Sequence, residues 1–462
     1  MSRETETLPR AAAAPAAGLG PTLGWLGLAL GALLLSSLFA ALLVAARVPA
    51  LAAVLPHTDF FRSALVLHVN LSVLVWFMAF AGALWSLLAP GRWRGPGWLA
   101  LAACALGTPL MASTPFRSEA PAVLANYVPV IHEGGFLGGL GLLGFGVALA
   151  ALRAAVVGRP RALPADAGGL AALGVWLASL AALAALLALA HSAWTLAADG
   201  PEGLAGYYES LFWGGGHVLQ IVHGLLMVSG WLWLLRSGPN LGPWARLLCT
   251  LGLVAAAVPA LAGLLAEWGL SDDPAARRHA FTLIMAIGGW LTLVPFALFV
   301  WRRSDGARAE GLAVPLSVGL FLAGVLAASL IRGDSLLVPA HYHGAIGAVT
   351  LVYMGLLYRL LPALGLARVA APSLRRQLAA YALGMLILVL GLGWSGLLGV
   401  VRKAPDTGLE GPAYAAMTLM GAGAAVALVS VLAFVFLCAR AALPQRGWQP
   451  QPLRGLRWGE RS

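Results

Sequence analysis

Long apolar runs recur along almost the whole of this chain. A helix needs about 20 predominantly apolar residues to cross a bilayer. Twelve such runs can be drawn, and they cover 22–46, 63–89, 96–114, 131–156, 168–195, 209–235, 243–266, 276–301, 312–331, 336–361, 378–401 and 413–439. With 60% hydrophobic and only 10% charged residues, no run is left over as a soluble domain. We therefore predict an all-α polytopic membrane bundle of about twelve transmembrane helices.

The bundle is predicted to be one domain, residues 22–439, with a cytoplasmic segment at 1–21 and a cytoplasmic tail at 440–462. A signal peptide is an alternative for the first run. That run is too long for a signal peptide, however, and no clear cleavage site follows it. We therefore treat it as the first transmembrane span.

The basic residues predict the orientation. With both termini cytoplasmic, the outer loops hold only eight of the 29 Lys and Arg residues, namely Arg47, Arg62, Arg117, Arg277, Arg278, Arg332, Arg402 and Lys403. This asymmetry is what the positive-inside rule predicts. The net charge of +11 is therefore a topology signal, and it gives no reason to expect nucleic-acid binding.

The nine histidines gather toward one side of the predicted membrane. All lie in outer loops or the outer third of a span, except His223, which lies one to two turns deeper. An isolated membrane histidine usually bonds a neighbouring helix or sits at the interface. Several at one depth on different spans favour a functional site, because ionisable groups are expensive in a bilayer. The candidates at similar depth are His68, His217, His341 and His343.

His341 and His343 form the most informative pair. At about 100° per residue, two positions along a helix turn the side chains roughly 200° apart. The two imidazoles cannot chelate one metal together, but each can hold a different centre. Imidazole suits iron and copper, and an apolar bundle suits a haem. His68 could share one haem with either member of the pair, and spacing does not decide which.

Four short motifs resemble subunit I of the haem-copper oxidase superfamily, most closely the C-type cytochrome c oxidases and the nitric oxide reductases. Val338–Gly347, which contains Ala-His-Tyr-His-Gly, is similar to the family's tenth helix, and Leu67-His68-Val69-Asn70 to its low-spin haem helix. A third motif, Trp213-Gly-Gly-Gly-His217, is similar to the element that holds the family's non-haem metal. The fourth, Leu392-Gly-Trp-Ser-Gly with Val401-Arg402-Lys403, is similar to the loop that binds its haem propionates.

The resemblance implies a role for each of these residues. His68 and His343 are expected to bind a low-spin haem, and His341 to be the proximal ligand of a high-spin haem. His217 is expected to serve a non-haem copper or iron beside it, and Arg402 and Lys403 to bind propionates. The resemblance implies two haems, which we expect to be b-type, one low-spin and one high-spin. The sequence has no Cys-x-x-Cys-His motif for covalent haem.

The sequence departs from the family at the non-haem metal. Leu264 and Leu265 stand where the family has an adjacent His-His pair, and Ile221 follows His217 by one turn where relatives have a tyrosine or a glutamate. Leucine cannot ligate a metal, so the ordinary three-histidine site cannot be drawn. A substitute that combines His217 with other outer groups stays open, and the candidates are His132, His191, His279, Glu133 and Glu267.

The resemblance also implies partners. Electrons would come from a periplasmic donor, with a small membrane-anchored cytochrome or copper subunit beside this chain. Asp199, Glu202 and Glu209 in the loop 197–209 could attract a basic cytochrome. No Asp, Glu or Lys lies in the middle of a predicted span, so we expect any consumed protons to come from the outer side.

Three kinds of function follow from these observations. The first is a respiratory oxidoreductase in the bacterial inner membrane that reduces O2 or NO at the His341 haem. The second is a diverged member of the superfamily that keeps haem but lacks the second metal, and acts in electron transfer, gas sensing or assembly. The third is a transporter without haem, for which the four outer histidines would be coincidental.

Overall fold

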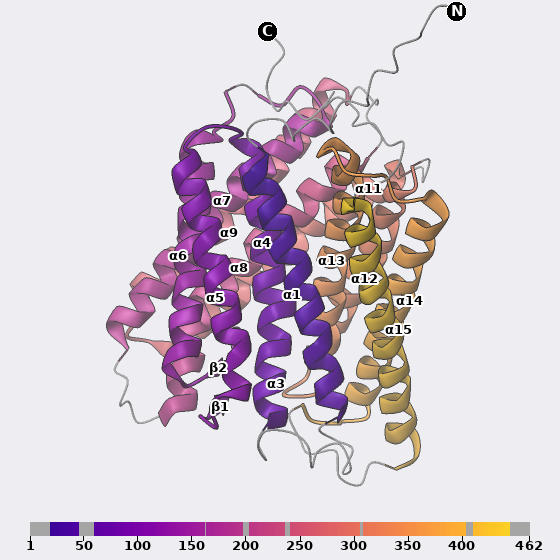
Figure 1. The fold of residues 1–462 in the computed structure, drawn as a ribbon. Coiled ribbons are helices and arrows are strands. Elements are labelled where there is room, and N and C mark those ends of the chain that lie inside the picture. The colour runs from indigo at the N-terminus through magenta and orange to yellow at the C-terminus, as the bar shows by residue number, and fades with distance from the viewer. Residues whose placement is uncertain are drawn as a thin grey trace, which may run out of the picture.

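The computed structural model describes residues 19–45, 60–161, 163–196, 203–235, 241–304, 308–402 and 410–443 (Figure 1). Twelve helical segments of this described part are long and apolar enough to cross a membrane. Each of them overlaps one predicted span. The predicted all-α bundle is therefore confirmed, and the protein is a multi-pass membrane protein.

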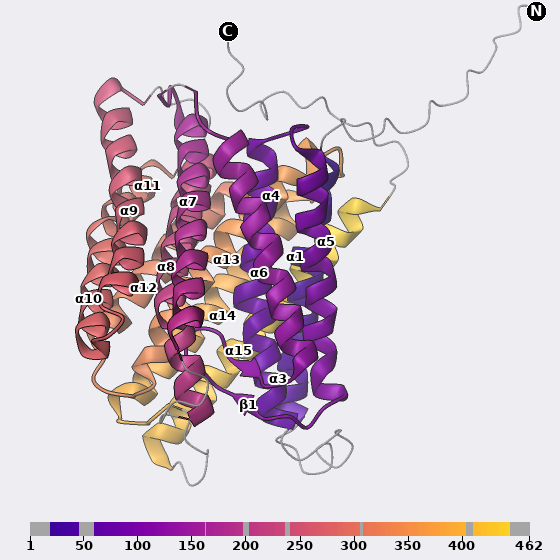
Figure 2. The same cartoon turned by 90° about the vertical axis from the view of Figure 1, so that its left-hand side faces the viewer.

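Most spans are single helices, and two are interrupted by π-helical turns (Figures 1 and 2). The single helices are α1 (Gly20–Ala45), α5 (Arg94–Ser113), α6 (Gly134–Val157), α7 (Ala167–Thr195), α8 (Gly203–Leu234), α9 (Pro243–Gly269), α12 (Ala313–Ser329), α13 (Leu337–Ala363), α14 (Ala371–Leu397) and α15 (Gly411–Ala442). The second span joins α3 (Phe60–Val69), η1 (Asn70–Val75) and α4 (Trp76–Leu88). The eighth span joins α10 (Pro274–Ala286), η3 (Ile287–Leu291) and α11 (Leu293–Arg303), while the 3₁₀ turns η2 (Thr114–Phe116) and η4 (Glu310–Leu312) adjoin α5 and α12.

Two helices begin earlier than the hydropathy pattern predicts. Helix α8 starts at Gly203 rather than at 209, and α14 starts at Ala371 rather than at 378. The additional turn of α14 carries Arg375 and Arg376, which interrupt the apolar run. A helix continues through such residues at the membrane surface, where charged side chains can reach water.

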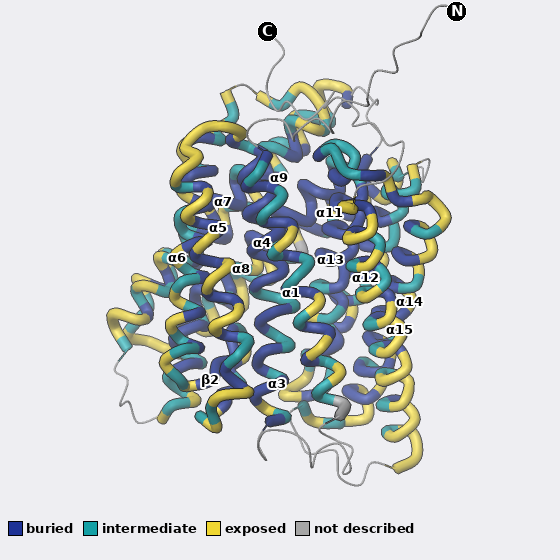
Figure 3. Tube along the Cα trace, viewed as in Figure 1, coloured by how far each residue is buried: buried dark blue, intermediate teal, exposed yellow. Residues whose placement is uncertain are grey.

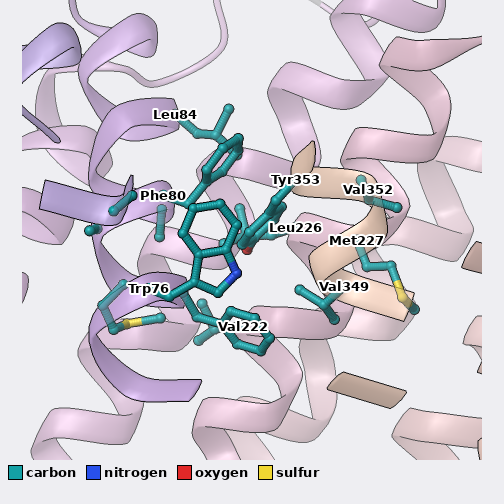
Figure 4. Close-up of a cluster of buried hydrophobic side chains, with 14 of the residues drawn as sticks. Trp76, Phe80, Leu84, Val222, Leu226, Met227, Val349, Val352 and Tyr353 are labelled. Carbon is teal, nitrogen blue, oxygen red and sulfur yellow. The ribbon is translucent and has the colours of Figure 1, made fainter. Parts of the chain in front are cut away.

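Helix α8, which carries His217, and helix α13, which carries His341 and His343, lie at the centre of the bundle (Figure 3). In α8 and α13, 83% of the most apolar window is buried, against 28% in α15. Aromatic side chains fill the space between these helices and α4 (Figure 4). The rings of Phe80 and Tyr353 stack with centroids 4.1 Å apart, and Trp76 meets Tyr353 edge-on at 5.9 Å. This packing fixes the second, sixth and tenth spans relative to one another.

A short β-hairpin lies at the end of the bundle opposite to the start of α1 and the end of α15 (Figure 1). Strand β1 (Ala122–Val123) pairs antiparallel with β2 (Val130–Ile131). We call residues 117–133 the hairpin loop and this end of the bundle the hairpin end. The hydropathy pattern predicts a connection between two spans here but no hairpin, and residues of this loop reach the candidate functional site.

Arg153 is buried within the bundle, although a charged residue is usually exposed to water. It lies inside α6 and is buried rather than solvated in a loop. Its guanidinium donates to the carbonyl oxygens of Ala89 at 2.5 Å, Arg92 at 2.6 Å and Trp93 at 3.1 Å. The carbonyl of Ala89 follows the last turn of α4, where helix carbonyls lack intrahelical partners, and those of Arg92 and Trp93 lie just before α5. Arg153 therefore caps α4 and ties the turn between α4 and α5 to α6.

Candidate functional site

The paired histidines of α13 turn toward different neighbours, as their spacing predicts. Nδ1 of His341 lies 2.9 Å from the carbonyl oxygen of Gly324 on α12. A Cβ at Gly344 would stand 2.6 Å from Cα of Gly324, so these two glycines let α12 and α13 approach closely. Nδ1 of His343 lies 2.8 Å from the carbonyl oxygen of Pro339, one turn earlier on its own helix.

His68 of α3 is near His343, close enough for a charge on one imidazole to act on the other. Its Nδ1 lies 3.0 Å from the carbonyl oxygen of Ser36 on α1. The hydroxyl of Ser36 also donates to the carbonyl oxygen of His68 at 3.1 Å. The π-helical turn η1 begins at Asn70, and such turns are frequent at functional sites. The structure thus brings together the two histidines for which a shared haem is predicted.

His68, His341 and His343 have the same hydrogen-bonding pattern. In each, Nδ1 faces a carbonyl oxygen, which can only accept, so Nδ1 carries the proton and Nε2 keeps its lone pair. Among the described residues, no protein group bonds any of the three Nε2 atoms, and each side chain is partly exposed. Metal-ligating histidines typically donate their other ring nitrogen to a carbonyl or carboxylate in this way. The three residues therefore fit the haems that the resemblance implies.

His217 of α8 has a different environment. Its Nδ1 lies 2.7 Å from the carbonyl oxygen of Trp213, and its Nε2 lies 2.6 Å from the hydroxyl of Tyr127 in the hairpin loop. Burial raises the pKa of Tyr127 above its ordinary value, so the hydroxyl stays protonated and donates to Nε2. Both ring nitrogens of His217 are therefore occupied by protein groups.

The glycines of the Trp213–His217 motif make room for this contact. A Cβ at Gly216 would stand 2.4 Å from the ring of Tyr127. The imidazole of His217 also packs against Tyr127 and Phe281, with centroids at 4.5 and 4.9 Å. The motif that suggested a metal ligand in the sequence thus accommodates an aromatic side chain.

The other candidate ligands for a second metal do not gather around His217. His132 bonds the hydroxyl of Tyr208 through Nδ1 at 2.7 Å, His191 lies beside Trp268, and His279 is exposed. Within the described segments, no three His, Cys, Asp or Glu side chains converge as a metal site requires. The residues present therefore do not fit a second metal in this arrangement.

Glu267 is fully buried at the hairpin end of α9, and it forms an ion pair rather than a metal site. Its Oε1 lies 2.9 Å from Nη1 of Arg277 on α10 and 2.6 Å from the hydroxyl of Ser192 on α7. A Cβ at Gly214 would stand 2.0 Å from Oε2, so α8 also packs closely against this carboxylate. Arg277, predicted in an outer loop, instead lies buried in the first turn of α10.

Arg402 lies at the hairpin end, near the first turn of α13. Its guanidinium lies 2.7 Å from Oδ1 of Asp334 and donates to the side-chain oxygen of Asn126 at 3.1 Å. Its charge also acts on Tyr127 and Tyr342. A haem propionate at Arg402 would share it with Asp334. Lys403, the other predicted propionate ligand, lies outside the described residues.

The hairpin loop is tied to several helices around the site. Asn126 donates from its backbone and its side chain to Glu209 of α8, at 2.9 and 2.6 Å. Asn70, two residues after His68, donates to the carbonyl oxygen of Pro129 at 2.7 Å. Because Glu209 accepts both hydrogen bonds from Asn126, this carboxylate of the predicted acidic loop is bound within the fold. Asp199 and Glu202 of the predicted acidic loop, and His57, lie outside the described residues.

The sequence did not indicate Tyr127 and Asn126 as parts of the site. In the hairpin loop only His132 and Glu133, at its end, were candidate ligands, and the loop is an ordinary connection in the hydropathy pattern. The only available signal was the Gly-Gly-Gly before His217, since glycine leaves space that another group can fill. That signal does not say which group fills the space.

Comparisons with known proteins show relatives but give no function. No family model matches the chain. An uncharacterized protein of Rickettsia prowazekii is 24% identical, over 90% of this chain and 94% of its own length. An uncharacterized protein of Aquifex aeolicus is 29% identical, over 74% of this chain and 84% of its own length. The similarity to the first extends over nearly the whole bundle.

Proposed function

We propose that this chain is a membrane di-haem protein of the kind represented by subunit I of the haem-copper oxidases. His68 and His343 would hold one b-type haem, and His341 would hold the other. The supporting observation is the shared state of these three imidazoles, each with Nδ1 on a carbonyl and with no partner for Nε2 in the part of the chain that the structure describes. A transporter without haem would have no need of three histidines prepared in this way.

The residues around each imidazole orient it for this role. A hydrogen bond from Nδ1 to a carbonyl fixes the tautomer and the ring orientation, and it makes Nε2 a stronger base. For His68 the acceptor is on α1, and for His341 it is on α12. Bound haem iron would supply one-electron transfer and, where a coordination position is open, binding of a diatomic gas. The apolar core formed by α4, α8 and α13 would keep water away.

We place the hairpin end at the outer face of a bacterial inner membrane, with both termini cytoplasmic. In this orientation the protein takes electrons from a periplasmic donor, through a small membrane-anchored cytochrome or copper subunit, and reduces O2 or NO. Arg402 and Lys403 would bind propionates there, since charge-assisted hydrogen bonds from cations suit carboxylates.

A second candidate is a diverged member that keeps both haems and transfers electrons, senses a gas or assists assembly without the second metal. The observation in its favour is that Tyr127 occupies Nε2 of His217. It differs from the first candidate in turnover, because the reductases of the superfamily use a non-haem metal beside the high-spin haem.

Three measurements on the purified protein test these proposals. Reduced-minus-oxidised spectra should show b-type bands, and their absence would favour a transporter. Metal analysis should give two irons per chain, and a stoichiometric third metal would contradict the metal-free arrangement of His217. Consumption of O2 or NO with an artificial electron donor should then separate the reductase from the diverged member.

A further inference from the structure

A groove runs along the membrane-facing side of α14 and α15, at the end of the bundle away from the hairpin loop. Its volume is about 590 Å³. On α14 it is lined by Ser373, Arg376, Gln377 and Ala380, whose spacing places them on one helical face. On α15 the lining extends from Ala425 to Leu437. The groove is therefore an open surface depression between one face of α14 and one face of α15.

The walls of this groove are mainly hydrocarbon. Val429 and Phe436 are 66% and 63% exposed. The polar groups at its base already have partners, because Gln377 donates to the hydroxyl of Ser430 at 3.2 Å and Ser430 donates to the carbonyl oxygen of Gln377 at 2.8 Å. An occupant would thus gain from apolar contact along most of the groove, and it needs no polar groups there.

The mouth of the groove is cationic. Arg376 lines it, and Arg440 is exposed one turn beyond Phe436 on the same face of α15. Neither α14 nor α15 contains an aspartate or a glutamate. A negative group at the mouth would therefore meet these two cations and no carboxylate from these helices.

The length and lining of the groove suit a hydrocarbon chain. Residues 425 to 437 span about 18 Å at 1.5 Å per residue. An extended acyl chain can lie along this length against the exposed side chains of Val429 and Phe436.

We propose that this groove is a binding site for one anionic phospholipid. An acyl chain would lie along α15 against Val429 and Phe436, and the phosphate would bind the guanidinium of Arg376. Selectivity over zwitterionic lipids would come from the net negative charge of the lipid headgroup beside Arg376 and Arg440. This inference does not depend on haem, because it uses a different part of the bundle.

Native mass spectrometry can test the proposal with the whole protein. The protein is placed in nanodiscs of equal parts phosphatidylglycerol and phosphatidylcholine and then stripped of loosely held lipid. The wild type should retain phosphatidylglycerol in preference to phosphatidylcholine. Arg376→Gln should lower that preference about tenfold, and Ala433→Trp, which fills the groove, should remove the retained lipid altogether.

Two matched controls isolate the groove. Arg302→Gln removes an exposed cation at the end of α11, and Val258→Trp enlarges a membrane-facing residue of α9 that is 56% exposed. Both should retain lipid as the wild type does. The proposal would be overturned if all four variants retained equal phosphatidylglycerol, if phosphatidylcholine bound as well as phosphatidylglycerol, or if a quinone or a protein helix occupied the groove.

Discussion

The hydroxyl oxygen of Tyr127 lies 2.6 Å from Nε2 of His217, and Trp213 accepts from the opposite ring nitrogen. Tyr127 comes from a loop between α5 and α6, far from His217 in the chain. A loop residue thus occupies the nitrogen that a metal would need. His217 is therefore held by hydrogen bonds to Tyr127 and Trp213 and by packing against aromatic rings.

This relationship predicts the effect of Tyr127→Phe. The substitution keeps the ring but leaves Nε2 of His217 buried without a partner. We expect the free energy of unfolding to fall by about 1–3 kcal/mol. Non-haem metal content should not rise, because tight binding needs three or more converging ligands. Chemical unfolding in detergent and metal analysis measure both quantities.

Tyr414→Phe is the matched control for Tyr127→Phe, because Tyr414 is 64% exposed on α15. It should leave the unfolding free energy unchanged within about 0.5 kcal/mol. Equal stability of the two variants would show that the bond to His217 contributes nothing. A stoichiometric copper or zinc in Tyr127→Phe would show that Tyr127 only covers a metal site.

A second prediction separates the members of the α13 pair. His341→Ala should abolish carbon monoxide binding and leave the low-spin bands, whereas His343→Ala should remove the low-spin bands and leave carbon monoxide binding. The reason is that His343 lies near His68, while His341 faces α12. Optical spectra of the reduced protein with and without carbon monoxide distinguish them.

The exposed His279 provides the control for these substitutions. His279→Ala should change neither the low-spin bands nor the binding of carbon monoxide. If carbon monoxide still bound to His341→Ala but not to His343→Ala, the assignment within the pair would be reversed. If all three variants kept both properties, the histidines of α13 would not be haem ligands.

The sequence predicted the parts of this protein that depend on periodicity. Apolar runs predicted twelve spans, because a bilayer demands a fixed length of apolar helix. The two-residue spacing of His341 and His343 predicted that they face different neighbours, because helical geometry fixes that angle. The pairing of His68 with His343 rather than with His341 was expected only from the resemblance, because similar depth and helical spacing did not decide between them.

The rest depended on contacts between distant segments. Glu267 and Arg277 looked like separate outer residues, and only the packing of α9 against α10 makes them a buried pair. Nothing in the sequence indicates that Arg153 is buried, and only the packing of α6 brings it against the end of α4. Tyr127 lies in a short irregular loop, whose path is determined by hydrogen bonds rather than by a repeating pattern.

A third prediction concerns the pH dependence of stability at Glu133, the residue that caps α6. Backbone hydrogen bonds from Gly135 and Phe136, and to a smaller extent the charge of Arg117, hold the pKa of Glu133 below its ordinary value of 4.5. Its stabilising contribution is therefore complete above that ordinary pKa. It is lost as the pH falls through the lower pKa of the folded protein.

Glu133→Gln removes this dependence, because an amide does not titrate. At pH 7 we expect the variant to be less stable than the wild type by about 0.5–1 kcal/mol. The difference should vanish once the pH lies below the folded-state pKa of Glu133. Unfolding midpoints measured from pH 7 down to about pH 3 test this, and a difference that persists unchanged at the low end would contradict it.

The final prediction concerns the buried pair of Glu267 and Arg277. Glu267→Gln leaves the guanidinium buried without a counter-charge, so we expect a loss of about 3–5 kcal/mol in the free energy of unfolding. Asp334→Asn breaks a pair whose carboxylate is 72% exposed, and it should cost no more than about 1 kcal/mol. The double variant Glu267→Gln with Arg277→Met should recover most of the loss, because no unpaired charge remains. Chemical unfolding of the wild type, of Glu267→Gln, of Arg277→Met and of the double variant measures the coupling, with Asp334→Asn as the exposed control. A double variant no more stable than Glu267→Gln would show that shape rather than charge holds α9 and α10 together.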